Sequence, residues 1–408
     1  MAKPRVVVLC GAGLSAEVGL PTMARWSQCV QQHPGIKERD RRDLQAIHIE
    51  CNAILGQVGA TAANLEHLAS TLEMLRLCRP AFEFQECVEH RTPSQGLRLL
   101  RSTICQIYSP DPTDLRHNAG NMIHALVDRA SDLHIITTNY DLNIELGAAH
   151  LGYAIDVSSE IDRARATLRN KEEADIFSMY SAPSRGRPAS RPSPIGLSKL
   201  HGSVNWFTLP DGLLVADALK LCHSDDRQSY FRLLSMNEGL VDPTSTCIVA
   251  PSITKGDHFL VVGSQWKSAA EAIRAADQLW IIGYSFPASD AFMRYFMATS
   301  LRRNTTLGRL VVIDPCASEI VERTAGLFGP PVFAGEIESY PVSWTRLHPY
   351  FGSICQGDYK PTASNQLIRQ LQDENQGKRI LAGRHQTDDL PFDHDIGRNS
   401  RARDSRRR

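Results

Sequence analysis

The sequence predicts an α/β fold in which helices cover both faces of a parallel β-sheet. The chain contains several short apolar runs that each end in small or polar residues, and stretches with helical spacing lie between them. Near-continuous apolar strands are typical of a parallel sheet whose two faces are both buried. The predicted strands are Val6–Cys10, His134–Thr138, Cys247–Ala250, Gln278–Gly283 and Arg309–Asp314.

The first strand leads directly into a glycine-containing turn, in the segment RVVVLCGAGLSAEVGLP at residues 5–21. Glycines let a backbone approach a phosphate closely, and the N–H groups at the start of a following helix attract its charge. The dinucleotide fingerprint GxGxxG does not continue here, because the third glycine is Gly19. For GAGLS, a nucleotide site and a plain strand-to-helix turn therefore both remain open.

Helical spacing replaces the strand pattern between residues 36 and 130. Leu65, Leu68, Leu72 and Leu75 recur at i, i+3, i+7 and i+10, which places them on one face of a helix. We expect this region to be a helical insertion or a small subdomain, within a domain that spans residues 1–350.

The second predicted strand ends in polar side chains, in the segment IITTNYDLNIELG at residues 135–147. Asn139 and Asp141 follow the strand and precede a helix whose apolar face is formed by Leu142, Leu146 and Ala149. Open α/β sheets bind their ligands at the carboxyl ends of their strands. The two polar side chains therefore either contact a ligand or cap the helix.

Two later segments also carry candidate site residues. His201 lies in SKLHGSVNWF at residues 198–207, and imidazole suits proton transfer at neutral pH, although a lone histidine is more often structural. In LWIIGYSFPASDAFMRYFM at residues 279–297, a strand leads to Gly283 and Ser285 and then to a helix capped at Ser289 or Asp290. That helix is expected to bury Met293, Met297 and Leu301.

The predicted strand LVVID ends in a carboxylate, Asp314. If this strand belongs to the same sheet, Asp314 is placed to accept hydrogen bonds from a ribose. The alternative is that it caps the next helix.

Composition and charge exclude several classes of protein. The chain has 408 residues, of which 42% are hydrophobic, so it can bury a sizeable core. Lys plus Arg and Asp plus Glu both number 45, which gives no overall attraction to nucleic acid. No apolar run is long enough to cross a membrane, and the strand at the N-terminus leaves no room for a signal peptide, so we expect a cytoplasmic protein. The ten cysteines include no CxxC pair, and we expect reduced thiols and no zinc.

Two segments have compositions that disfavour packing. Residues 180–196 are rich in Ser, Pro, Arg and Gly, which predicts a flexible loop. Residues 376–408 are expected to form a disordered basic tail that attracts an acidic partner or nucleic acid, or has no function. The arginines of its end are Arg398, Arg401, Arg403, Arg406, Arg407 and Arg408.

Taken in order, the segments GAGLSAEVGLP, TTNYD, KLHGSVNW, IIGYSF and VVID resemble the sirtuin family, and more closely its zinc-free bacterial-type branch. The resemblance covers residues 4 to about 345 and implies NAD bound across a Rossmann-like sheet. It implies that Asn139 and Asp141 face the nicotinamide ribose and carboxamide, and that His201 is the catalytic base. It implies pyrophosphate contacts from Gly11, Ala12, Gly13 and Ser15, and adenosine contacts from Gly283, Ser285 and Asp314.

The sequence departs from the deacylating sirtuins in three places. Their two CxxC pairs are missing, Thr22, Met23 and Ala24 follow GLP in place of Asp-Phe-Arg, and no Phe-Gly-Glu segment is recognisable near residues 248–256. Members of the zinc-free branch are commonly NAD hydrolases, often in antiphage defence. We therefore expect hydrolysis of NAD, as substrate, to nicotinamide and ADP-ribose. The alternatives are an NAD-dependent protein deacylase and a catalytically silent NAD or ADP-ribose sensor. We also expect a homo-oligomer and a trigger or regulatory protein, and no membrane partner.

Overall fold

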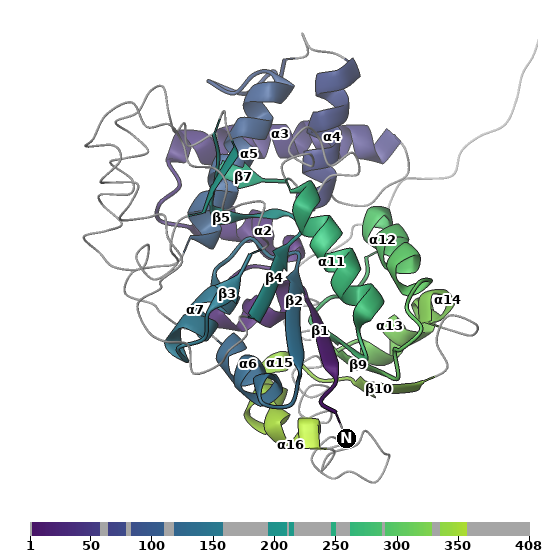
Figure 1. Ribbon diagram of the computed structural model, residues 1–408. Helices are drawn as coiled ribbons and strands as arrows, with labels where there is room; N and C mark the ends of the chain where they lie inside the picture. The colour runs from purple at the N-terminus through teal and green to yellow at the C-terminus, as the bar shows by residue number, and fades with distance from the viewer. Residues whose placement is uncertain are drawn as a thin grey trace, which may run out of the picture.

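A seven-stranded sheet forms the centre of the computed structural model, which describes residues 2–57, 64–78, 83–109, 118–157, 195–209, 212–215, 246–249, 262–287, 290–328 and 335–356. The strand order is β10-β9-β8-β1-β2-β4-β3, and neighbouring strands in this sheet pair in parallel. The strands are β1 (Arg5–Cys10), β2 (Asp132–Thr137), β3 (Ile155–Asp156), β4 (Ile195–Lys199), β8 (Gln278–Ile282), β9 (Arg309–Ile313) and β10 (Glu336–Tyr340). This confirms the predicted α/β fold with a Rossmann-like parallel sheet (Figure 1).

The strand order reverses at β1, which pairs with β2 on one side and with β8 on the other. On one side of β1 lie β2, β4 and β3, which come next in the sequence. On the other side lie β8, β9 and β10, which come later in the sequence. Ligands of open α/β sheets bind in the crevice that such a reversal leaves outside the carboxyl ends of the strands. The topology therefore points to the ends of β1, β2 and β8.

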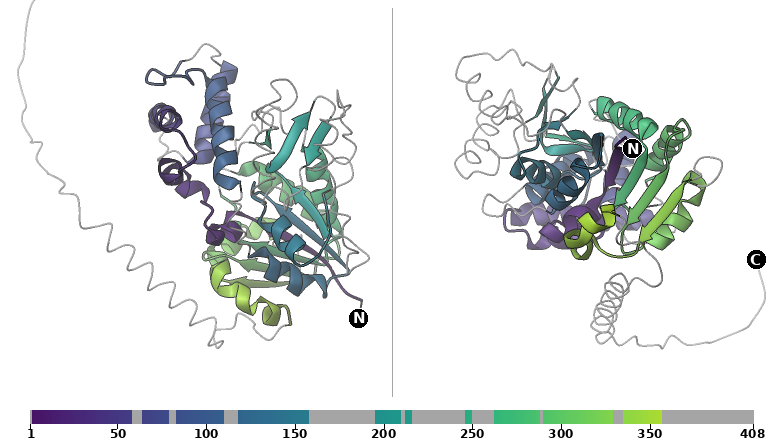
Figure 2. Two further views of the ribbon diagram at one scale, coloured as in Figure 1. Left: turned by 90° about the vertical axis from the view of Figure 1, so that its left-hand side faces the viewer. Right: turned by 60° about the horizontal axis from the view of Figure 1, so that its bottom comes forward.

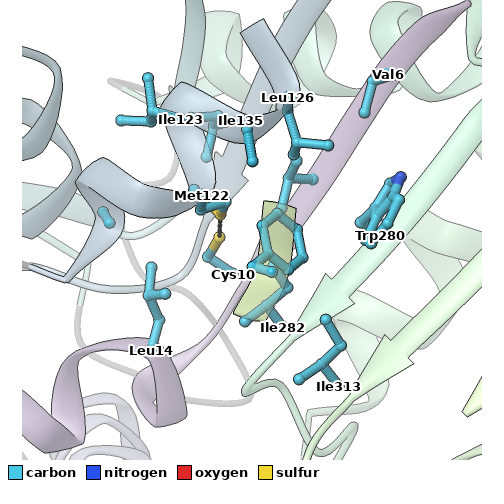
Figure 3. Packing of buried hydrophobic residues seen from close by; sticks show 14 of the residues in the cluster. Val6, Cys10, Leu14, Met122, Ile123, Leu126, Ile135, Trp280, Ile282 and Ile313 are labelled. Carbon is cyan, nitrogen blue, oxygen red and sulfur yellow. Dashed lines mark hydrogen bonds between the residues drawn. The ribbon is translucent and has the colours of Figure 1, made fainter. Parts of the chain in front are cut away.

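Helices cover both faces of the sheet, as the sequence predicted. Alternate residues of β1 face opposite sides, so that Val6, Val8 and Cys10 join one hydrophobic cluster and Val7 and Leu9 join another. The first cluster, shown in Figure 3, packs under α6 (Ala119–Val127), α7 (Asn143–His150), α15 (Trp344–Leu347) and α16 (Phe351–Gln356). The second packs under α11 (Gly263–Ala275), α12 (Ala291–Leu301) and α13 (Ala317–Arg323).

A group of helices stands beyond the carboxyl edge of the sheet (Figures 1 and 2). It consists of α3 (Glu38–Gln57), α4 (Leu65–Cys78) and α5 (Pro93–Tyr108), and these share one hydrophobic cluster. In α4 the residues Leu65, Leu68 and Leu72 are buried as the spacing predicted. Within the region expected to be inserted, α6 instead packs against the sheet. The limits of the domain, 1–350, and of its insertion, about 36–130, remain proposals.

The chain connecting these units contains short helical turns. They are α1 (Ala12–Ser15), η1 (Ala16–Val18), η2 (Met23–Arg25), α2 (Trp26–Gln32), α14 (Ala325–Phe328) and η6 (His348–Tyr350). Asp290 caps α12 by accepting a hydrogen bond from the backbone N–H of Met293, which confirms one of the two predicted capping residues. Ser289 lies outside the described residues, as do the predicted tail 376–408 and nearly all of the loop 180–196.

One strand prediction was wrong in its sheet. Residues 247–250 were expected to join the parallel sheet, but β7 (Thr246–Ile248) pairs antiparallel with β5 (Gly202–Leu209), which also pairs with β6 (Gly212–Val215). A short apolar run predicts a buried strand but does not identify its partner. The small sheet begins at Gly202, whose φ of 76° lies in the left-handed region. No larger residue fits at this position, because a Cβ there would overlap the carbonyl oxygen of Cys247.

Among the described residues, no helix is long and apolar enough to cross a membrane.

Candidate active site

A pocket lies at the carboxyl ends of β1, β2 and β8, below the helices α4 and α5. The loop after each of these strands contributes to its wall, and Leu65, Glu66 and Tyr108 close it from the side of the helices. The predicted site residues that line the pocket are Ala12, Ser15, Asn139, Asp141, His201, Gly283 and Ser285. Gly11, Gly13 and Asp314 do not line it. The fold thus brings together segments that are more than a hundred residues apart in the sequence, at the point where the strand order reverses.

The glycines after β1 pack against the loop after β8. The N–H of Gly11 donates to the carbonyl of Ile282 at 3.0 Å, and the N–H of Gly13 donates to the carbonyl of Gly283 at 2.9 Å. A Cβ built on Gly13 would lie 2.7 Å from the Cα of Gly283, which itself has a φ of 62°. The two loops therefore meet backbone to backbone, and side chains on either would separate them. Contact between these glycines and a pyrophosphate stays a prediction.

Asn139 ties the end of β2 to the end of β1. Its Nδ2 donates to the carbonyl of Gly11 at 2.9 Å and to the Oγ of Ser15 at 3.1 Å. Its Oδ1 makes no hydrogen bond within the described part of the chain, although the residue is only 8% exposed and lines the pocket. Because the donor group is already engaged, Asn139 offers a ligand an acceptor, which suits a hydroxyl group.

Asn143 and Asn118 extend the hydrogen bonds of Asn139 and Ser15 into the interior of the protein. Neither was identified as a site residue from the sequence. The Nδ2 of Asn143 donates to Ser15 Oγ at 3.2 Å and to Asn118 Oδ1 at 2.8 Å. The Nδ2 of Asn118 in turn donates to the carbonyl of Leu14 at 2.7 Å. All three polar side chains are buried, and the network fixes the β1–α1 loop. In the sequence, the one sign of this network is the second asparagine of the segment NYDLN, Asn143.

Asp141 lies both at the turn before α7 and at the wall of the pocket. Its Oδ1 accepts a hydrogen bond from the backbone N–H of Asn143 at 2.9 Å, at the start of α7. The residue also lines the pocket with 5% of its surface exposed, and its Oδ2 has no hydrogen-bond partner among the residues described. One carboxylate oxygen thus fixes the turn before α7, whose N-cap residue is Leu142, and contact between the other oxygen and a ligand stays a prediction.

His201 lies between two aromatic rings at the pocket wall. Its ring centroid is 6.2 Å from that of Tyr140 and 6.3 Å from that of Trp266, and 5% of the residue is exposed. Its carbonyl accepts a hydrogen bond from the N–H of Val249, and Tyr140 donates its hydroxyl proton to the carbonyl of Val249. The backbone of His201 is therefore tied to Val249, the residue after β7, which also binds Tyr140 from the loop after β2.

A buried ion pair lies directly behind these residues. The Nζ of Lys199, which is fully buried, lies 2.7 Å from Glu145 Oε1 and also donates to the carbonyl of Asp141. Burial raises the pKa of Glu145, and the charge of Lys199 opposes that shift. The pair connects α7 and β4, and thereby Asp141 and His201. Sequence reasoning missed it because the two partners are distant in the chain and meet only in the folded sheet.

The opposite wall carries carboxylates and phenol rings. Glu66, from α4, and Asp290 both line the pocket and are almost fully buried. The hydroxyl of Tyr284 donates to Asp290 Oδ2 at 2.7 Å, and Tyr108 donates to the carbonyl of Pro21 at 2.9 Å. Burial, followed by the charge of Asp290, raises the pKa of Tyr284. Negative charge beside aromatic rings favours a cationic ring in this part of the pocket.

Two predicted adenosine contacts differ in their position. Ser285 lines the pocket and is exposed, and its carbonyl accepts a hydrogen bond from Arg323. Asp314 follows β9 at the same edge of the sheet, but it lies outside the pocket and its Oδ1 accepts from the N–H of Cys316 before α13. The carboxylate thus fixes the turn before α13, whose N-cap residue is Cys316, and its contact with a ribose stays a prediction. No group of three or more His, Cys, Asp and Glu side chains suited to a metal ion occurs in the described ranges.

No family model and no curated protein matches this chain. Comparison with solved structures finds sirtuins at low similarity. A Sir2 homologue in complex with NAD is 12% identical, with a TM-score of 0.38 over 86% of this chain and 90% of that one. A Sir2 homologue mutant in complex with ADP-ribose is 11% identical, with a TM-score of 0.37 over 86% and 92%. Sir2Tm bound to a propionylated peptide is 12% identical, with a TM-score of 0.35 over 88% and 94%.

Proposed function

We propose that this protein consumes NAD, and that it hydrolyses NAD to nicotinamide and ADP-ribose. The observation that carries the proposal is the meeting of Asn139, Asp141 and His201 in one pocket at the strand reversal. The sequence motifs that resemble sirtuins supply these same three residues. The proposal thus rests on two features of these three residues, their place in the fold and their residue types.

The groups that line the pocket fit the nicotinamide half of NAD. Among the described residues, the Oδ1 of Asn139 and the Oδ2 of Asp141 are acceptors without a hydrogen-bond partner, and ribose hydroxyls and a carboxamide N–H are donors. The carboxylates of Glu66 and Asp290 suit the positive charge of the oxidised nicotinamide ring. The pyrophosphate and the adenosine half are proposed to lie along Ala12, Ser15 and Ser285.

The reaction breaks the bond between C1′ of the ribose and the nicotinamide nitrogen, which takes the electron pair. The sugar carbon becomes cationic, and water attacks it and releases a proton. We propose that His201 accepts that proton, since imidazole has its ordinary pKa near neutral pH. Asn139 and Asp141 orient the ribose and the departing ring, and the buried pair of Lys199 and Glu145 keeps Asp141 in place.

The cellular setting of this activity is also part of the proposal. We propose a cytoplasmic enzyme in which residues 1–350 form the NAD-binding domain, and in which antiphage defence is served by depletion of NAD. A trigger or regulatory protein would then keep the activity low in healthy cells, and assembly into a homo-oligomer is one means of such control.

One experiment separates this proposal from its alternatives. The purified full chain is incubated with NAD alone, and nicotinamide and ADP-ribose are quantified by chromatography. Release of both without any peptide supports hydrolysis. Turnover that appears only with an acyl-lysine peptide, together with an acylated ADP-ribose, identifies a deacylase. Binding of NAD without consumption, also in lysates of phage-infected cells, identifies a sensor and overturns the enzymatic proposal.

A further inference from the structure

A second concavity is lined by residues of α11, α12 and the turn after α12. The two helices lie side by side in Figure 1. This groove has a volume of about 810 Å³, which is large enough for several side chains of a ligand. None of its lining residues is acidic. They are the aromatic Trp266, Phe292, Tyr295 and Phe296, the cationic Lys267, Arg274, Arg302 and Arg303, and the small or polar Ala270, Thr299 and Ser300.

The groove carries four cationic side chains, from Lys267, Arg274, Arg302 and Arg303. Their side chains make no ion pair or hydrogen bond with any residue in the described ranges. Asp277, which follows α11, is already bound to Arg5 at 3.0 Å. Like charges that line one concavity raise its potential, so the groove attracts an anionic group.

The aromatic residues add an apolar surface that the fold itself does not cover. Tyr295 is 74% exposed and Phe292 is 38% exposed, although both belong to a helix whose other face buries Met293 and Met297 in the core. The ring of Trp266 forms the floor, with edge-to-face contacts at 5.0 Å to Phe292 and at 4.9 Å to Phe296. Exposed apolar surface with a polar rim is typical of a binding site.

The chain itself contains a segment with the complementary composition. Residues 387–397 read TDDLPFDHDIG, in which the apolar Leu390, Phe392 and Ile396 alternate with Asp388, Asp389, Asp393 and Asp395. Four carboxylates would face the four cations, and the apolar side chains would face the aromatic floor. We propose that residues 388–396 of the same chain bind in the groove between α11 and α12.

The connecting chain is long enough for this. Residues 357–387 lie between α16 and the segment, and a flexible chain of this length has a root-mean-square span of roughly 30 Å and a maximum of about 100 Å. Binding within one chain also raises the effective concentration to roughly the millimolar range, so individually weak contacts suffice. The arginines of the terminus begin after the segment, at Arg398. The proposal thus replaces the expectation of a wholly disordered tail.

Photo-cross-linking of the full chain tests the proposal. The photoreactive residue p-benzoylphenylalanine replaces Phe392, and the cross-linked peptides are mapped by mass spectrometry. We expect cross-links to residues 263–303. The double variant Arg302→Glu/Arg303→Glu, whose positions are exposed, should lower their yield roughly fivefold or more, and Asp388→Lys/Asp389→Lys should restore it. The variant Lys3→Glu/Arg98→Glu makes the same change in net charge at exposed positions outside the groove and should have no effect.

Three outcomes would overturn the proposal. The first is cross-linking mainly to residues outside 263–303. The second is an equal yield in the groove variant and in its charge-matched control. The third is cross-linking between copies, which a mixture of isotope-labelled and unlabelled chains detects and which would assign the groove to a second molecule.

Discussion

The ammonium group of Lys199 and the carboxylate of Glu145 are 2.7 Å apart, with the lysine fully shielded from water. Removing one partner of such a pair leaves the other charge buried alone. We expect Glu145→Gln to lower the free energy of unfolding by about 3 kcal/mol, measured by urea titration. The double variant Glu145→Gln/Lys199→Met should recover part of that loss, because no lone charge remains. The pair Arg39 and Glu89 has the same separation but is about half exposed, so Glu89→Gln should cost less than about 1 kcal/mol. Equal losses at the two sites would contradict the importance of burial.

His134 makes stability depend on pH. Burial lowers the pKa of this histidine to about 4, well below the ordinary value near 6.5 that it regains on unfolding. Between these values the unfolded chain binds a proton that the folded chain does not, so the contribution is complete above pH 6.5 and is lost as the pH falls towards 4. We expect a loss of up to about 3 kcal/mol over this range. In His134→Gln the slope of unfolding free energy against pH should be smaller. An unchanged slope would show that His134 titrates normally.

Gly13→Ala should destabilise the fold. The added methyl group would lie 2.7 Å from the Cα of Gly283, so the loops after β1 and β8 must separate. We expect a loss of about 1–3 kcal/mol, measured by thermal and urea unfolding. Gly263→Ala is the matched control, because a Cβ there meets nothing within 4 Å and a helix favours alanine. Wild-type stability in Gly13→Ala together with weaker NAD binding would instead favour direct contact between this glycine and phosphate.

His201→Ala and Asn139→Ala should each lower NAD turnover by roughly 10²-fold or more, with a smaller effect on affinity. Because both residues would serve one step, the double variant should be little worse than either single variant. Asn139→Ala also loses two buried hydrogen bonds, so its stability must be measured as well. Asn143→Ala provides the control, since it disrupts the same network without lining the pocket. Turnover at the parent rate in folded His201→Ala would remove the assignment of the base.

Glu66→Gln should weaken the binding of NAD more than that of ADP-ribose. The carboxylate lines the pocket where the proposal places the cationic ring, and ADP-ribose lacks that ring. Loss of one favourable charge contact of about 1 kcal/mol corresponds to a roughly fivefold increase in the dissociation constant. Calorimetric titration of a slowly reacting His201→Ala background gives both affinities. Equal weakening for the two ligands would place Glu66 away from the nicotinamide half.

Much of the sheet was predictable because its central strands are buried on both faces. The residues of β1, β8 and β9 form long apolar runs, His134 interrupts the run in β2, and the structure contains all four strands as parallel neighbours. The strand β10 escaped prediction because its residues Glu336 and Ser339 interrupt the apolar pattern at the edge of the sheet. The run at residue 247 was recognised as a strand but placed in the wrong sheet, since composition does not specify a pairing partner.

The candidate site was also predictable in part. Asn139 and Asp141 could be found because they follow a predicted strand, and His201 could be found because it stands in a recognisable motif. Glu66 and Asn118 could not, because neither follows a strand and tertiary packing alone brings them to the other residues. The close approach of Gly13 to Gly283 is likewise a property of two loops that meet only after folding.

The central position of β1 has a consequence for the synthesis of this protein. β1 leaves the ribosome first, but β2 begins at Asp132 and β8 only at Gln278, so the strand must wait for most of the chain before both of its neighbours exist. The pocket needs the ends of all three strands, and parallel pairings between distant segments form slowly. A nascent chain therefore carries no assembled pocket until translation has passed β8.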